Sequence, residues 1–367
     1  MPRGPELCAL CAACKAACPT YGLLASEAYS PRGRMLLVQA LREGALRPTR
    51  ALYQRLYSCA LCGACDATCP VGLEPTRWLY EARAALRGQN RRHLLLAALL
   101  KAALRRPALS FRLGRLSGGR LLFGPLKGVE LPASPLREGQ VLLSPERPKG
   151  RVAVFSGCLS TYVLPQVGQA LVGLLQALRY EVLLPGGELC CSAPLRGLGL
   201  AQEAAEFARR NSALLRALQV EAVLSPCPTC TLALRKQYPH MGVQPVEQAQ
   251  DALGFLLRQT KEGLDLSAWE GQELSWHEPC HSYWGLGLRG LARALRLKVR
   301  LPGQLCCGLP LSITAPELSQ RLLGELRRAH EGAHLVLSPC PGCLLQLRRA
   351  GLRAQHPLEL LAQAYLV

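Results

Sequence analysis

The C-terminal two thirds of the chain alternate short apolar runs with longer helical patterns. Residues 152–155, 180–184 and 220–224 are short, mainly apolar runs that predict strands. Residues 166–178 and 201–218 lie between them and have helical periodicity, with many helix-forming residues. Strands that alternate with helices indicate a parallel sheet, whose ligands gather on loops beyond the carboxyl ends of the strands.

The first 90 residues have a different pattern. Their β signal is weak, whereas residues 34–46 and 73–87 have helical periodicity. We therefore predict a mainly helical N-terminal domain.

Residues 151–260 and 272–367 look like two copies of one unit. In each copy a Leu-Pro-Gly turn precedes a pair of adjacent cysteines, and a Val-Leu-Ser-Pro-Cys-Pro-x-Cys segment follows. This agreement in order and spacing is typical of an internal duplication. We predict four parts: 1–90, a basic linker or amphipathic segment at 91–150, and copies at 151–260 and 272–367.

The number and spacing of the cysteines indicate what the chain binds. The 367 residues include 18 cysteines, of which only Cys158 and Cys280 stand apart from every other cysteine. Such close spacing favours metal chelation over long-range disulfides.

Two cysteine runs near the N-terminus have the spacing of bacterial ferredoxins. They are Cys8-x2-Cys11-x2-Cys14-x3-Cys18-Pro19 and Cys59-x2-Cys62-x2-Cys65-x3-Cys69-Pro70. Three thiolates two residues apart can surround one cubane cluster, while the fourth, held off by the Cys-Pro step, reaches the other cluster. The predicted [4Fe–4S] ligands are Cys8, Cys11, Cys14 and Cys69 for cluster 1, and Cys59, Cys62, Cys65 and Cys18 for cluster 2. Structural zinc is the alternative, but a third equally spaced cysteine followed by Cys-Pro, found twice, favours iron and sulfide.

Each C-terminal copy carries five cysteines, one more than a cubane cluster needs. Adjacent cysteines can bind neighbouring irons, and a bridging thiolate would use a fifth ligand. Soft thiolates suit iron–sulfur clusters and zinc alike, so a cluster, zinc, a disulfide or no ligand all stay open. The candidate ligands are Cys158, Cys190, Cys191, Cys227 and Cys230 for cluster 3, and Cys280, Cys306, Cys307, Cys340 and Cys343 for cluster 4.

His277 and His281 flank Cys280. They are candidates for hydrogen-bond donors to sulfur or for proton carriers near an acceptor site, and a purely structural role is the alternative.

The chain is strongly basic, with 44 Lys and Arg against 25 Asp and Glu. Residues 91–127 contain nine basic residues and no acidic residue, around an apolar run at 94–100 that is too short to span a membrane. This segment predicts a basic amphipathic helix that lies on a membrane or a partner, or packs on its own domain. No nucleic-acid recognition motif accompanies the charge, so we expect no nucleic-acid partner.

No secretory signal and no membrane-spanning stretch is visible. Free thiolates need a reducing compartment. We therefore expect a cytoplasmic protein, with a peripheral contact on the inner face of the cell membrane as a further expectation.

Two ferredoxin runs followed by two cysteine-rich "CCG" domains resemble the iron–sulfur subunit of glycolate oxidase over nearly the whole chain. Softer stretches carry the same resemblance, namely Leu-Cys-Cys-Gly at 305–308, Pro-Glu-Leu-Ser-Gln-Arg-Leu at 316–322, His-Glu-Pro-Cys-His at 277–281 and His-Pro-Leu-Glu-Leu-Leu at 356–361. The chain departs from the motif at Ser192, where glycine is expected, and the second copy has fewer residues between its lone cysteine and its cysteine pair.

The resemblance implies an α+β multidomain fold, in which a mainly helical di-cluster ferredoxin domain precedes two duplicated α/β cysteine-rich domains. Similar modules occur in iron–sulfur subunits of anaerobic glycerol-3-phosphate dehydrogenase, in lactate-utilisation proteins and in heterodisulfide reductases. In the last of these, such cysteine sets hold noncubane [4Fe–4S] clusters, which implies the same for the two C-terminal sets here.

The resemblance also implies a function. It implies an electron-transfer subunit that passes electrons from an FAD-containing subunit, where glycolate is oxidised to glyoxylate, to a quinone or another acceptor. The chain shows no Gly-x-Gly-x-x-Gly unit and no catalytic acid–base pair, so we expect no catalytic residue in it. The alternatives are a subunit for another 2-hydroxy acid such as lactate, for glycerol 3-phosphate, or of heterodisulfide-reductase type, and, in a different class, a zinc-binding assembly scaffold.

Overall fold

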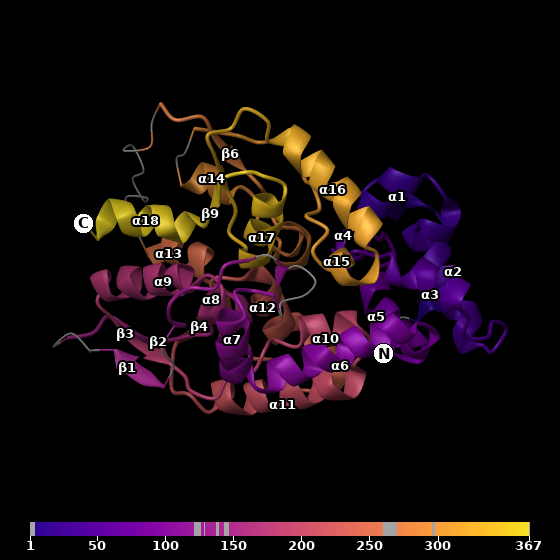
Figure 1. Cartoon of the computed structure of the whole chain (residues 1–367), viewed down its shortest axis with the longest axis horizontal. Coiled ribbons are helices and arrows are strands. Elements are labelled where there is room, and N and C mark those ends of the chain that lie inside the picture. Colours follow the sequence, from indigo (N-terminus) through magenta and orange to yellow (C-terminus); the bar gives the residue numbers. More distant parts are fainter. Residues whose placement is uncertain are drawn as a thin grey trace.

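Three regions make up the computed structural model, which describes residues 4–120, 126–127, 129–136, 139–142, 147–259, 269, 271–295 and 298–366. A helical N-terminal region lies against two α/β halves, which sit side by side (Figure 1). This arrangement confirms the predicted fold class.

Helices built from short amphipathic segments form the N-terminal region. They are α1 (Pro19–Leu24), α2 (Pro31–Arg42), α3 (Arg50–Tyr57), α4 (Ala64–Ala67) and α5 (Pro75–Leu86). Ser30 caps α2 and Thr49 caps α3, each by accepting a hydrogen bond from a backbone N–H of the first turn. Helices α2, α3 and α5 enclose a small core that includes Leu56, Leu79 and Leu86.

The basic segment forms two helices, α6 (Arg91–Arg105) and α7 (Pro107–Leu116). Asn90 caps α6, and Pro107 starts the next helix because proline is tolerated in a first turn but not in a helix interior. Lys101 and Arg105 pair with Glu203 and Glu206 of the first α/β half. Helix α6 therefore packs partly on its own chain.

The first half, residues 139–259, contains a five-stranded sheet. Its strands are β1 (Gln140–Leu142), β2 (Gly150–Val154), β3 (Tyr180–Leu184), β4 (Ala222–Ser225) and β5 (Ala249–Asp251), in the order β1-β3-β2-β4-β5. Strand β1 is antiparallel to β3 and the other pairs are parallel. Its helices are α8 (Gly157–Tyr162), α9 (Pro165–Ala177), α10 (Ala193–Gly197), α11 (Ala201–Arg216), α12 (Pro228–Leu232) and α13 (Ala252–Gln259).

The second half, residues 271–366, repeats this arrangement. Its strands are β6 (Leu274–Trp276), β7 (Val299–Arg300), β8 (Leu335–Leu337) and β9 (Ala354–Gln355), all parallel, in the order β7-β6-β8-β9. That order equals β3-β2-β4-β5 of the first half, which confirms two α/β copies. Its helices are the π-helical turn η9 (His281–Leu286), α14 (Leu291–Ala294), α15 (Leu311–Thr314), α16 (Pro316–Ala329), α17 (Pro341–Arg349) and α18 (Pro357–Tyr365).

The two halves share one apolar core, which runs through residues of both sheets. Helices also pack across the boundary between the halves. Helix α18 of the second half packs on α9 of the first, and α13 of the first packs on α14 of the second (Figure 1). The boundaries at 90, 150, 260 and 272 stay predictions, and residues 260 and 367 lie outside the described residues. Across the described residues, no helix has the length and apolarity needed to cross a bilayer.

Candidate iron–sulfur centres

The parallel-strand topology places cysteines just beyond the carboxyl ends of two neighbouring strands in each half. In open α/β sheets, ligands bind beyond the carboxyl ends of strands, where the strand order reverses. That point lies between β2 and β4 in the first half, and these strands lead into Cys158 and Cys227. It lies between β6 and β8 in the second half, and these lead into Cys280 and Cys340. The duplicated topology therefore presents cysteines at the same place twice.

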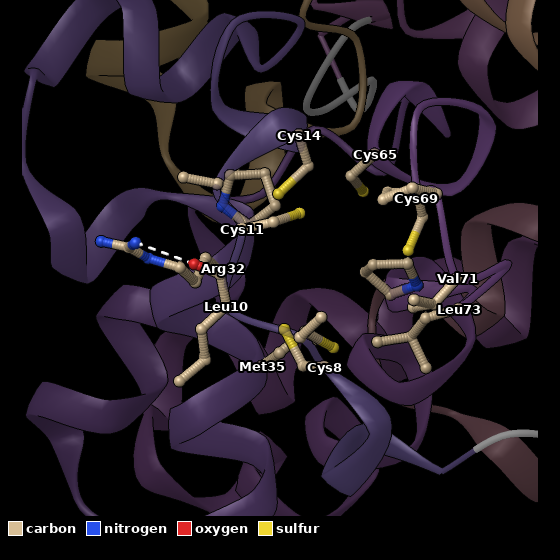
Figure 2. Close-up of a pocket in the computed structure, with 15 residues that line it drawn as sticks. Cys8, Leu10, Cys11, Cys14, Arg32, Met35, Cys65, Cys69, Val71 and Leu73 are labelled. Atoms are coloured by element: carbon tan, nitrogen blue, oxygen red, sulfur yellow. Dashed lines mark hydrogen bonds between the residues drawn. The ribbon is translucent and has the colours of Figure 1, made fainter.

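A pocket in the N-terminal region gathers the thiols predicted for cluster 1. Cys8, Cys11, Cys14 and Cys69 line this pocket, and Cys65 lines it too (Figure 2). Its remaining walls are mostly apolar, as with Met35 and Leu73. Burial raises the pKa of the Cys14 thiol to about 11, with smaller contributions from Cys8 and Cys11. A thiol with such a pKa is protonated at neutral pH unless a metal binds it as the thiolate.

The thiols predicted for cluster 2 also lie together. Burial raises the pKa of Cys59 and Cys65, and each of these thiols also interacts electrostatically with Cys62 and Cys18. Cys18 comes from the first run and lies near these thiols of the second run. The assignment of individual thiols to clusters stays a prediction.

Left-handed backbone recurs at matching places in the two runs. Leu10 and Ala12 flank Cys11 with φ of 54° and 65°, and Leu61 and Gly63 flank Cys62 with φ of 53° and 77°. Left-handed residues cost free energy when they are not glycine, and alternating conformations of this kind turn backbone N–H groups towards an anionic or sulfur-rich group. The Leu61 N–H already donates to Cys59 Sγ, 3.3 Å away.

The five thiols of the first half form one cluster. The Cys158 and Cys190 Sγ atoms are 3.9 Å apart. The Cys190 thiol also interacts with that of Cys191, and Cys191 with Cys230. The thiols of Cys230 and Cys227 interact in turn. Gly157 is needed there, because a Cβ at its position would lie 2.9 Å from Cys230 Sγ.

The five thiols of the second half are arranged in the same way. The Cys343 and Cys307 Sγ atoms are 3.4 Å apart. The Cys343 thiol also interacts with that of Cys340, and Cys280 interacts with Cys306. The structure therefore brings together each of the two five-cysteine sets that the sequence groups.

The thiol sets also meet one another. The Cys227 thiol of the first half interacts with the Cys340 thiol of the second, and the Cys280 thiol of the second half interacts with the Cys62 thiol of the N-terminal region. Cys62, Cys280 and Cys306 pack around one small apolar cluster. The sequence could not place these contacts, which link the N-terminal region to the second half and the second half to the first.

Several polar side chains that sequence reasoning missed hold the cysteine loops. Asn211 is fully buried, bonds Leu189 N–H and C=O at 2.9 and 3.0 Å, and donates to Cys190 C=O at 3.2 Å. Gln346 donates to Cys307 C=O at 2.8 Å. Both loops are thus held by a buried amide, each from a different helix.

Two buried arginines do the same for the N-terminal region. Arg34 donates to Thr20 and Ser58, which places the loops of Cys18 and Cys59 together. Arg83 donates to the carbonyls of Cys59 and of Gly197, 2.7 and 2.9 Å away, and so ties the second run to the first half.

The two histidine candidates have different surroundings. His277 is buried and lies edge-on to His330, with ring centres 5.9 Å apart, and burial lowers its pKa to about 3. His281 instead bonds Thr229 and the carbonyl of Leu61. Between them, burial raises the pKa of Glu278 to about 7, and Trp276 Nε1 donates to its carboxylate. The roles of both histidines stay predictions.

The residues present fit iron–sulfur clusters. All eighteen cysteines are free thiols. Buried hydroxyl groups without a hydrogen-bond partner among the described residues lie within two residues of a cysteine, at Ser160, Ser192 and Ser338. No three Cys, His, Asp or Glu side chains of the described residues are grouped around a single-ion position. The thiols predicted for cluster 1 line a pocket instead, and soft thiolate donors of this kind suit iron and sulfide.

Fold and thiols together define an iron–sulfur protein. A family model for a 4Fe-4S dicluster domain matches residues 5–73, and a model for a cysteine-rich domain matches residues 152–235 and again 274–348. The chain therefore combines a 4Fe-4S dicluster domain with two cysteine-rich domains.

Curated relatives share this layout. The glycolate oxidase iron-sulfur subunit of Escherichia coli (strain K12) is 27% identical over 385 residues, covering 97% of this chain and 93% of the relative. A Bacillus subtilis (strain 168) protein provisionally assigned as a glycolate oxidase iron-sulfur subunit is 27% identical over 418 residues, with the same coverage of both chains. One subunit of the anaerobic glycerol-3-phosphate dehydrogenase of E. coli (strain K12) is 32% identical over 239 residues, covering 59% of each chain.

Proposed function

We propose that the chain is the iron–sulfur electron-transfer subunit of a complex that oxidises glycolate. The observation that carries this proposal is the 27% identity to the E. coli glycolate oxidase subunit across 97% of this chain. The grouping of all eighteen cysteines into four neighbouring sets supports the electron-transfer part of the proposal.

Each set has a proposed occupant. Cys8, Cys11, Cys14 and Cys69 hold one [4Fe–4S] cluster, and Cys59, Cys62, Cys65 and Cys18 hold a second. The two five-cysteine sets hold further clusters of cubane or noncubane type. When bound, such clusters accept and release single electrons at potentials that the protein tunes. The chain supplies the thiolates, and Arg34, Arg83, Asn211 and Gln346 hold the loops that carry them.

The proposed partners are an FAD-containing dehydrogenase subunit as electron donor and a quinone or another membrane-linked acceptor. The sequence contains no flavin-binding fingerprint, which supports a separate flavoprotein. The substrate would then be bound and oxidised outside this chain.

Anaerobic co-purification with the flavoprotein tests the proposal. We expect glycolate to bleach the visible absorbance of the iron–sulfur chain in the complex. Cys14→Ala should lose cluster 1 and the onward reduction of the acceptor, while the partner still reduces its own flavin. Acceptor reduction at the wild-type rate in Cys14→Ala would contradict the proposed role of this thiol set.

A second candidate is a subunit for glycerol 3-phosphate, favoured by the 32% identity to the glycerol-3-phosphate dehydrogenase relative over 239 residues. Adding glycolate, lactate and glycerol 3-phosphate separately to the same complex distinguishes these functions. Bleaching by glycerol 3-phosphate alone would select the second candidate. A colourless protein that binds zinc would select the assembly scaffold.

Helices α6 and α7 support a peripheral contact with an anionic membrane. Their exposed faces carry leucines, among them Leu95 at 62% and Leu116 at 86% exposure. Exposed arginines such as Arg91, Arg92 and Arg112 lie beside these leucines, and residues 91–127 contain no acidic residue. Apolar side chains flanked by basic ones suit the headgroup region of an anionic bilayer.

Vesicle sedimentation tests this contact. The protein should bind phosphatidylglycerol vesicles at low salt, and Arg91→Gln with Arg92→Gln should weaken binding about fivefold per charge. Leu116→Asn should also weaken binding, whereas Leu301→Asn, at an exposed leucine of the second half, should not. Equal binding of all variants would remove the membrane contact from the proposal.

A further inference from the structure

One side chain touches all three cysteine-bearing regions. His281 Nε2 lies 3.0 Å from the carbonyl oxygen of Leu61, and Nδ1 lies 2.8 Å from Thr229 Oγ1. A carbonyl oxygen only accepts, so Nε2 carries the hydrogen and donates it. Nδ1 and the Thr229 hydroxyl share the second hydrogen bond. Both ring nitrogens therefore have a partner.

The two partners of His281 lie inside cysteine loops. Leu61 stands between Cys59 and Cys62, and Thr229 stands between Cys227 and Cys230. His281 itself follows Cys280. Leu61 has left-handed backbone, with φ of 53°, so its peptide direction is already strained and depends on its contacts. One imidazole thus joins three loops that come from distant parts of the chain.

The internal repeat provides a natural comparison. Leu159 occupies the position of His281 in the first half, directly after the lone Cys158. It points to Gly342 between Cys340 and Cys343, where a Cβ would lie 3.8 Å from the Leu159 Cδ1 atom. Each half therefore extends the residue after its lone cysteine to the Cys-x-x-Cys loop of the other half.

Only one of these reciprocal contacts is polar. The N-terminal region docks at Cys280 of the second half, where the Cys62 and Cys280 thiols interact and pack on one apolar cluster. A leucine at position 281 would keep an apolar contact to the other half but would leave the Leu61 carbonyl without this donor. The histidine occurs on the side where a third loop has to be held.

We propose that His281 is a positioning residue that fixes the three cysteine loops relative to one another, through its bonds to Leu61 and Thr229. It acts as neither a metal ligand nor a proton carrier. The inference rests on the proposed iron–sulfur function only for its spectroscopic consequence, since the two hydrogen bonds and the three loops belong to the polypeptide.

Four variants of the anaerobically loaded full-length chain test this role. His281→Leu copies the first half, and Thr229→Val removes only the hydroxyl. Thr229→Ser keeps the hydroxyl, and Leu159→Ala removes the matching contact of the first half. Iron content should stay at the wild-type level in all four.

Hydrogen–deuterium exchange reads out the loops directly. We expect exchange in segments 58–64 and 226–231 to rise about fivefold in His281→Leu, as for loss of a hydrogen bond. Thr229→Val should raise exchange in segment 226–231 by the same factor, whereas Thr229→Ser, which keeps the hydroxyl, should exchange like the wild type. Leu159→Ala should leave exchange in segment 58–64 unchanged. The line shape of the dithionite-reduced protein in electron paramagnetic resonance should change in His281→Leu and Thr229→Val, because the spacing of neighbouring paramagnetic centres changes.

Two results would overturn the inference. Wild-type exchange in both segments of His281→Leu would show that the imidazole positions nothing. Loss of iron in His281→Leu with full retention in Thr229→Val would make His281 a ligand instead. A wild-type chain that takes up no iron would refute the proposed function, and the exchange measurement would still decide the role of His281.

Discussion

The two α/β halves have the same strand order and the same five thiols, yet they differ around those thiols. After its adjacent cysteines the first half has Ser192 and the second has Gly308, and both adopt left-handed backbone with φ of 73° and 67°. Both positions thus keep the left-handed backbone, although serine at 192 suits it less well than glycine at 308.

Other matching positions differ in polarity. At the helix start after the last strand, the first half has Asp251 and the second has His356, and each caps the following helix. The residue after the lone cysteine is Leu159 in one half and His281 in the other. Duplication therefore accounts for the thiol positions, while the neighbouring side chains follow what they contact, since His281 bonds Leu61 of the N-terminal region and His356 bonds Pro226 of the first half.

Cysteine variants in the two halves should have the largest effect. Cys230→Ala and Cys343→Ala remove matching thiols, and each should lose the iron of its own half because soft thiolates are the ligands grouped there. Iron and acid-labile sulfide per chain measure this loss. Loss of iron from both halves in either single variant would show one shared site, for which the Cys227–Cys340 contact provides a structural basis.

The second largest effect is expected for the buried side-chain amides of Asn211 and Gln346, which hold the cysteine loops. Asn211→Ala should destabilise the protein by about 2–3 kcal/mol, because it removes three backbone hydrogen bonds and leaves buried groups unpaired. Gln346→Ala should cost less, since Gln346 makes one backbone bond, to Cys307. Anaerobic urea unfolding measures both, with Arg209→Ala on the exposed face of α11 as control. A larger loss in Gln346→Ala would reverse the proposed ranking.

Acid should destabilise the second half through its buried His330. Burial, with a smaller contribution from Arg300, lowers the folded-state pKa of His330 from 6.5 to about 4. The unfolded chain then binds more protons between these values, so stability is full above pH 6.5 and falls towards pH 4, by up to about 1.4 kcal/mol per pH unit. His330→Gln should flatten the pH dependence of the anaerobic unfolding temperature, and exposed His334→Gln should not. Parallel curves for wild type and His330→Gln would contradict this assignment.

The smallest effect is expected at the position after the cysteine pair. Ser192→Gly should stabilise the protein by about 1 kcal/mol, because it relieves left-handed strain and removes an unpaired buried hydroxyl, less the entropy cost of glycine. Gly308→Ser should destabilise it, since a Cβ there would lie 2.8 Å from Leu322 Cδ1. Thermal unfolding compares the two. Stabilisation by Gly308→Ser would mean that the two positions are not equivalent.

Much of the fold was predictable because it depends on local pattern. The strand predicted at 180–184 is β3 (Tyr180–Leu184), and the helix predicted at 201–218 is α11 (Ala201–Arg216). Both ferredoxin-type runs and both five-cysteine sets were readable from spacing alone. The structure brings the members of each five-cysteine set together, while the assignment of individual thiols to clusters stays a prediction.

The contacts between regions were not predictable, because they depend on how distant segments meet. The packing of α18 on α9 and the interaction between the Cys62 and Cys280 thiols cannot be inferred from sequence spacing. The buried residues Arg83 and Asn211, which hold the cysteine loops, leave a weak signal in the sequence. Arg83 lies on the same helix face as Leu79 and Leu86, and Asn211 on that of Ala208 and Leu215, so a polar residue interrupts an apolar stripe in both helices.

The central claim is that these eighteen thiols hold iron and inorganic sulfide. Anaerobic reconstitution, followed by iron, sulfide and zinc analysis and by electron paramagnetic resonance after dithionite reduction, tests it most directly. We predict a brown protein with about eight irons or more per chain and signals of reduced clusters. A colourless protein that takes up no iron and binds about four zinc ions would contradict the account.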